Sequence, residues 1–111
     1  MSFLLPQGTH WGVANWVSRG FFTDAEPFLH EAPSLADDIR FCIQAETDTV
    51  DLRLADHAVL RELLALAEQV IAATRTAGPS SFHNADAYPV YLQRVEHLRD
   101  VVKSLSAPKT S

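Results

Sequence analysis

Residues 86–105 read DAYPVYLQRVEHLRDVVKSL, and their large apolar side chains recur at alternating steps of three and four residues. The stripe consists of Tyr88, Tyr91, Val95, Leu98, Val102 and Leu105. This spacing places all six on one face of an α-helix, because a helix completes a turn every ~3.6 residues. Asp86 is a suitable N-cap, and Pro89 falls in the first turn, where a missing N–H is tolerated. The stretch therefore predicts an amphipathic helix.

A second apolar stretch, HAVLRELLALAEQVIAATRTA, occupies residues 57–77. Its apolar side chains cover more than one stripe, which indicates a central helix that packs on more than one side. Asp56 is suited to cap its start, and Gly78 followed by Pro79 is a typical helix end. Because the polar link 78–85 is short, the two helices are expected to pack as an antiparallel pair.

The N-terminal half predicts shorter helices. Thr9 is expected to cap one that ends at Gly20. The capping-box residues 23–26 are expected to begin another that stops before Pro33. Residues 1–8 and 106–111 are expected to fray, as the ends of a domain often do.

Residues 39–54 fit two different structures. A helix over 35–46 would gather Leu35, Ile39, Cys42 and Ile43 on one side. Apolar and polar residues also alternate on both sides of the turn-forming residues 47–49, as in a β-hairpin. Both readings give the same class: one domain over residues 1–111, all-α or α-dominant, with two long antiparallel C-terminal helices at about 57–77 and 86–105. Short N-terminal helices cover the pair, with the hairpin at 39–54 as the alternative.

The charge balance excludes some classes of partner. The 111 residues hold 14 Asp and Glu against 9 Lys and Arg, so the net charge is -5. Such a chain is poorly suited to neutralise nucleic-acid phosphates or to dock on an anionic membrane. We expect no signal peptide and no membrane span. The single Cys42 cannot form an internal disulfide, which fits a reducing, cytoplasmic location.

The acidic side chains are concentrated in one third of the chain. Residues 24–56 hold nine acids and two bases, a net charge of -7, and each flanking segment carries +1. One interpretation is solubility and helix capping, because acids favour the first turns of helices. The other is an acidic face that steers a basic protein partner.

Aromatic residues gather earlier, with six of the ten within the first 28 residues. One interpretation is that these rings are buried and anchor the short N-terminal segments on the helix pair. The other is a partly exposed aromatic patch at an interface, for which Trp11 is the best candidate because it lies off the face shared by Val13, Trp16 and Val17. The candidate partner-binding residues are Asp37, Asp38, Glu46, Asp48, Asp51 and Trp11.

No motif in the sequence specifies a reaction. Gly-x-Ser-x-Gly and phosphate-binding glycine loops are missing, and no two of the five histidines are three or four residues apart. We therefore expect no catalytic residues, no metal and no cofactor. The alternative is a small metal- or ligand-binding enzyme whose site assembles from His10, His30, His57 and His83.

The leading hypothesis is a non-enzymatic interaction protein that binds a basic protein partner. Immunity proteins and antitoxins share its small size and acidic character, a likeness of composition and not of matched residues. A third hypothesis is a helical homodimer that uses the stripe of the last helix or the aromatic face.

Overall fold

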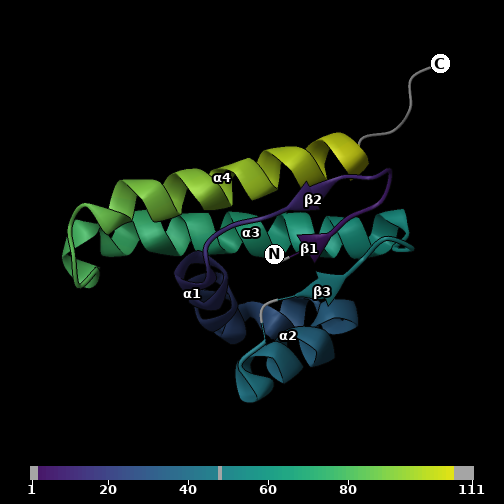
Figure 1. Ribbon diagram of the computed structural model, residues 1–111, viewed down its shortest axis with the longest axis horizontal. Coiled ribbons are helices and arrows are strands. Elements are labelled where there is room, and N and C mark those ends of the chain that lie inside the picture. Colours follow the sequence, from purple (N-terminus) through teal and green to yellow (C-terminus); the bar gives the residue numbers. More distant parts are fainter. Residues whose placement is uncertain (1–2, 48, 107–111) are drawn as a thin grey trace.

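The computed structural model describes residues 3–47 and 49–106. Helices α3 (His57–Ala77) and α4 (Ala87–Ser106) run side by side along the molecule and are joined by a turn containing the 3-10 helix η2 (Pro79–Ser81) (Figure 1). Asp56 caps α3, since its Oδ1 accepts from the Val59 N–H at 3.1 Å. Gly78 follows the helix with a φ of 72°. The predicted antiparallel pair and its bounds are confirmed.

Helix α3 is the central element. It contacts α4 on one side and α1 (Asn15–Ala25), α2 (Pro33–Ala45) and the 3-10 helix η1 (Glu26–Glu31) on the other (Figure 1). The side chains that it buries are Leu60, Leu63, Leu66, Ala67, Val70, Ile71 and Thr74. This wide buried surface explains why its apolar residues exceed a single stripe.

The described residues begin with a short strand. β1 (Phe3–Leu4) lies between β2 (His10–Trp11), which is antiparallel to it, and β3 (Val50–Asp51), which is parallel. Phe3 is fully buried and pairs with Trp11 on one side and Val50 on the other. The expectation that residues 1–8 fray is therefore wrong from Phe3 onward. The other segment expected to fray, 106–111, lies outside the described residues except for Ser106, which is the last residue of α4.

The helix expected from Thr9 to Gly20 is also wrong. Residues 10–11 form β2, and α1 begins at Asn15 and continues through Gly20 to Ala25. A Cβ at Gly20 would lie 3.2 Å from Cε1 of Tyr91. Gly20 therefore lets the Tyr91 ring approach α1 closely and does not end the helix.

The capping-box residues 23–26 do not begin a new helix. Thr23, Asp24 and Ala25 are the last residues of α1, and η1 follows directly. The Asp24 carboxylate accepts a hydrogen bond from the Tyr91 hydroxyl at 2.7 Å, so it joins α1 to α4. Asp86 was expected to cap α4, but its carboxylate accepts no hydrogen bond from the described residues. Instead, the backbone N–H of Asp86 donates to Oδ1 of Asn84.

Residues 35–45 are helical, which resolves the ambiguity between helix and hairpin. In α2 the buried side is formed by Leu35, Ala36, Ile39 and Cys42. The hairpin at 39–54 is wrong, because residues 39–45 belong to α2 and Val50 pairs with Phe3 of β1 instead. Glu46 ends α2 in the left-handed region, with φ 56° and ψ 34°.

Candidate protein-interaction surface

The candidate surface lies on the outer side of α2, far from α4 (Figure 1). Asp37 is fully exposed and Asp38 is exposed beside it. Phe41 follows one helical turn later, and 62% of its surface is exposed. Residues three or four apart are neighbours on a helix, so the Phe41 ring projects next to these two carboxylates. We call the surface formed by Asp37, Asp38 and Phe41 the α2 face.

The position of Phe41 follows from the helical period. Leu35, Ile39 and Cys42 direct one side of α2 into the core. A residue about half a turn from that side must face outward, and Phe41 occupies this place. A large ring in water forgoes the free energy that burial would contribute, so its exposure points to an interface.

Both ends of α2 are fixed to other elements. At its start, the Glu62 carboxylate of α3 accepts from the Ser34 N–H at 2.8 Å and from the Ser34 hydroxyl at 2.7 Å. At its end, the Arg19 guanidinium of α1 donates to the Glu46 carbonyl oxygen at 3.1 Å. These anchors hold the α2 face in one orientation, which lowers the entropic cost of binding.

The other predicted acids are less favourably placed. Glu46 is exposed at the opposite end of α2. Asp51 is exposed in β3, where Arg53 donates to its carboxylate from Nε at 2.9 Å and from Nη2 at 2.8 Å. These bonds, with a further one from the Arg53 N–H, lower the pKa of Asp51 to about 2. The charge of Asp51 is therefore balanced within the chain. Asp48 lies outside the described residues.

Trp11 is not part of an exposed surface. Only 3% of it is exposed, its ring packs on Phe3 and Phe21, and its Nε1 donates to the Arg94 carbonyl oxygen at 2.9 Å. The expectation that Trp11 is an exposed interface residue is wrong. The exposed tryptophan is Trp16, at 47%. Trp11 was misplaced because residues 10–11 are a strand, so the helical face used to place it does not exist.

Sequence reasoning missed Phe41. In a β-hairpin over 39–54, the alternation of side chains would place Phe41 on the same face as Ile39 and Ile43. A helical projection of residues 35–46 separates it from them and places it near Asp37. The signal was therefore present, but it could be used only once the helix was preferred over the hairpin.

The histidines do not assemble into a site. All five are exposed, and no group of three or more His, Cys, Asp or Glu able to hold a metal ion occurs within residues 3–47 and 49–106. Cys42 is buried, and its Sγ lies 3.7 Å from the Thr49 carbonyl oxygen. The structure therefore does not bring together His10, His30, His57 and His83.

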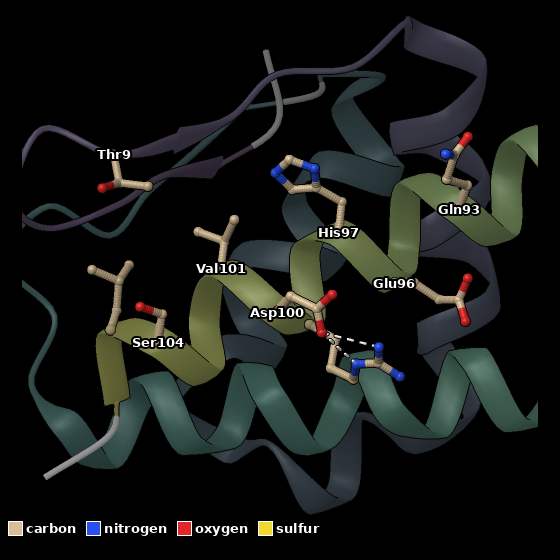
Figure 2. Close-up of a pocket in the computed structure, with 9 residues that line it drawn as sticks. Thr9, Gln93, Glu96, His97, Asp100, Val101 and Ser104 are labelled. Carbon is tan, nitrogen blue, oxygen red and sulfur yellow. Dashed lines mark hydrogen bonds and ion pairs between the residues drawn. The ribbon is translucent and has the colours of Figure 1, made fainter.

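A large open groove runs along α4 beside the turn that carries Thr9 (Figure 2). Its volume is about 670 Å³, and His97 and Val101 project into it on the side of Thr9. The Asp100 carboxylate is paired with Arg99 at 2.9 Å, and Glu96 is paired with Arg75. With its carboxylates engaged in ion pairs, the groove presents no acid and base aimed at one point.

Four of the six side chains in the predicted stripe of α4, and half of the ten aromatic residues, are buried within the chain. Tyr91, Val95, Leu98 and Val102 are buried against the rest of the core, as are Phe3, Phe21 and Phe22. The stripe of the last helix therefore leaves only its partly buried ends, Tyr88 and Leu105, for a second copy, and the aromatic face leaves one exposed ring, Trp16. Formation of a homodimer stays a prediction.

Comparison of the chain with protein-family models, with curated proteins and with solved structures found no match. Among the helices of the described residues, none has the length and apolar character needed to cross a membrane.

Proposed function

We propose that the chain is a non-enzymatic interaction protein that binds a basic protein through the α2 face. The observation that carries the proposal is the exposed Phe41 ring beside the carboxylates of Asp37 and Asp38 on a helix fixed at both ends. Aromatic residues, Phe among them, are enriched at protein interfaces, where polar side chains surround the apolar centre.

The carboxylates and the ring contribute to different stages of binding. Asp37 and Asp38 attract a basic partner over a distance and orient the encounter, most strongly at low salt. Phe41 then supplies apolar area that leaves water on contact and slows dissociation. Asp37 lies 3.9 Å from the Arg40 guanidinium, an exposed contact that leaves most of its charge available.

The class of partner that this surface fits is a protein with a basic groove. An inhibitor of the immunity or antitoxin type works in this way, since it covers the basic substrate groove of a toxin and needs no catalytic residue. The proposal places the chain in the cytoplasm, where a single free cysteine such as Cys42 stays reduced.

The test is capture of partners from an extract of the host cell, with identification by mass spectrometry and elution by salt. The wild-type chain is expected to retain a basic protein that elutes as salt rises toward about 0.5 M, where the screening length is only a few ångströms. The Asp37→Lys/Asp38→Lys variant and Phe41→Ser are each expected to lose it.

The matched control is Glu26→Lys/Glu68→Lys, which makes the same change in net charge at exposed positions outside the α2 face. It is expected to retain the partner. Equal loss in both double variants would show that total charge matters and location does not, which contradicts the proposal. Capture of an acidic protein, or of stoichiometric metal by the purified chain, would also contradict it.

A further inference from the structure

A second surface of opposite charge lies on the α4 side of the molecule. A hollow of about 530 Å³ is bordered by the link between β2 and α1, by the first turn of α1 and by α4. Its lining includes His10, Val13, Trp16, Val90 and Arg94. This volume falls within the range of ligand-binding hollows, about 300–1,000 Å³. We call it the Trp16 hollow.

The apolar part of the hollow is exposed but held in place. Trp16 is 47% exposed and Val90 is 41% exposed, the two large apolar side chains of this region that face water. The Trp16 ring lies 6.5 Å from the Tyr91 ring, and the Tyr91 hydroxyl is bound to Asp24. The base beneath Trp16 is therefore rigid, so little conformational entropy is lost when an apolar group covers it.

The charged part of the hollow is cationic. Within the described residues, no carboxylate lies within ion-pair distance of the Arg94 guanidinium, although Arg75 and Arg99 of the same helix pair are both matched with acids. The Arg94 backbone is fixed, because its carbonyl oxygen accepts from Trp11 Nε1 at 2.9 Å.

We propose that the Trp16 hollow docks an acidic, apolar peptide segment of a partner protein. An aliphatic or aromatic side chain of the segment covers Trp16 and Val90, and a neighbouring carboxylate accepts the two parallel N–H bonds that the Arg94 fork offers. Local charge complementarity selects this occupant: the unpaired Arg94 guanidinium lies beside an exposed indole, so an anionic group carried by an apolar segment fits here even though the chain as a whole carries a net charge of -5. The α2 face, on the far side of α3, has the opposite preference (Figure 1).

The test is a selection of random linear peptides displayed on phage against the immobilised chain. Peptides with Asp or Glu adjacent to Leu, Ile or Phe are expected to be enriched, and to bind the Trp16→Ser and Arg94→Glu variants at least about tenfold more weakly. Trp16 also reports binding directly, because Trp11 is buried and Trp16 is the exposed tryptophan. On binding, its fluorescence emission is expected to shift to the blue and to be quenched less by acrylamide.

Two further variants keep the result interpretable. Arg61→Glu makes the same charge change at an exposed position of α3 and is expected to leave binding unchanged. Arg94→Glu is expected to gain binding to versions of the selected peptides in which Asp and Glu are replaced by Lys, which a misfolded variant would not do. Selection of neutral or basic peptides at Trp16, or equal binding by wild type and Arg94→Glu, would overturn the proposal, as would dimerisation through Trp16 in light scattering.

The same selection separates this proposal from the proposed function. Basic peptides that depend on Asp37 and Phe41 report on the α2 face alone. Acidic, apolar peptides that depend on Trp16 and Arg94 report on the hollow alone, so each surface can fail without the other.

Discussion

Helices α3 and α4 bury aliphatic side chains spaced three or four residues apart, whereas the N-terminal half buries aromatic rings that lie far apart in the sequence. The rings of Phe3, Trp11 and Phe21 come from two strands and a helix, yet their centroids lie 5.6 to 5.9 Å apart. In the helix pair, local periodicity places each residue in the core. In the N-terminal half, position in the core depends on contacts made after the chain has folded back on itself.

The largest expected effect tests whether the small sheet is as important to the core as the helix pair. Phe3→Ala is expected to lower the free energy of unfolding by about 3–5 kcal/mol, because it leaves a cavity among aromatic rings. Leu98→Ala, at a fully buried position of α4, is the matched variant and is expected to lose about 2–5 kcal/mol. Urea unfolding of each variant and of the wild type measures both changes in the free energy of unfolding. A loss below about 1 kcal/mol for Phe3→Ala would mean that the sheet is peripheral.

A smaller effect is expected where the two regions are joined. Tyr91→Phe removes the hydroxyl of α4 that donates to Asp24 of α1, and is expected to cost about 1.5 kcal/mol at neutral pH. Burial, followed by the Asp24 carboxylate, raises the pKa of Tyr91 well above its ordinary value near 10. The native hydroxyl therefore keeps its proton when the unfolded one loses it.

The sign of the pH dependence follows from this difference. Stability from the Tyr91 proton is complete below about pH 10, where both states are protonated, and declines above it by up to about 1.4 kcal/mol per pH unit. Unfolding of wild type and Tyr91→Phe at several pH values measures the decline, since all other titrating groups are common to both. A difference between the two proteins that stays constant beyond pH 10 would contradict this account.

The smallest effect is expected from substitutions at two helix ends, those of α2 and α3. The residue after α3 is Gly78, with a φ of 72°, whereas the residue after α2 is Glu46, with a φ of 56°. Glu46→Gly is expected to raise the free energy of unfolding by about 0.5–1 kcal/mol, because glycine adopts this conformation without strain. Gly78→Ala should change stability with the opposite sign. Arg19 binds the Glu46 carbonyl oxygen, so that contact survives the substitution.

Prediction from sequence succeeded where each element carries its own pattern. The bounds of α3 matched, and α4 begins one residue after its predicted start, because caps and apolar stripes are local signals. Strands of two residues are too short to show alternation, so β1 and β2 could not be recognised. Gly20 resembles a helix end locally, but its role is set by the Tyr91 ring, which lies 71 positions away in the sequence.

The candidate surface could be predicted in part. Asp37 and Asp38 share the exposed side of α2, as helical spacing allows. Trp11 could not be placed, because the acceptor for its indole N–H is a carbonyl oxygen 83 residues away. Asp51 looked like a free charge, but its partner is the residue two positions further on in an irregular turn, where no helical or strand spacing applies.

The parallel pairing of β1 with β3 has a consequence for the order of folding. During synthesis, Phe3 and Leu4 leave the ribosome well before Val50 and Asp51, so β1 waits for both helices α1 and α2 to follow before its sheet can close. Closing a loop of this length costs more entropy than closing the short turn to β2, by about 0.6 kcal/mol for each doubling. Until then the Phe3 side chain has only part of its core around it. Of the three strands, β1 is therefore made before its partners and is completed only with β3, and until then its apolar side chains are open to a chaperone.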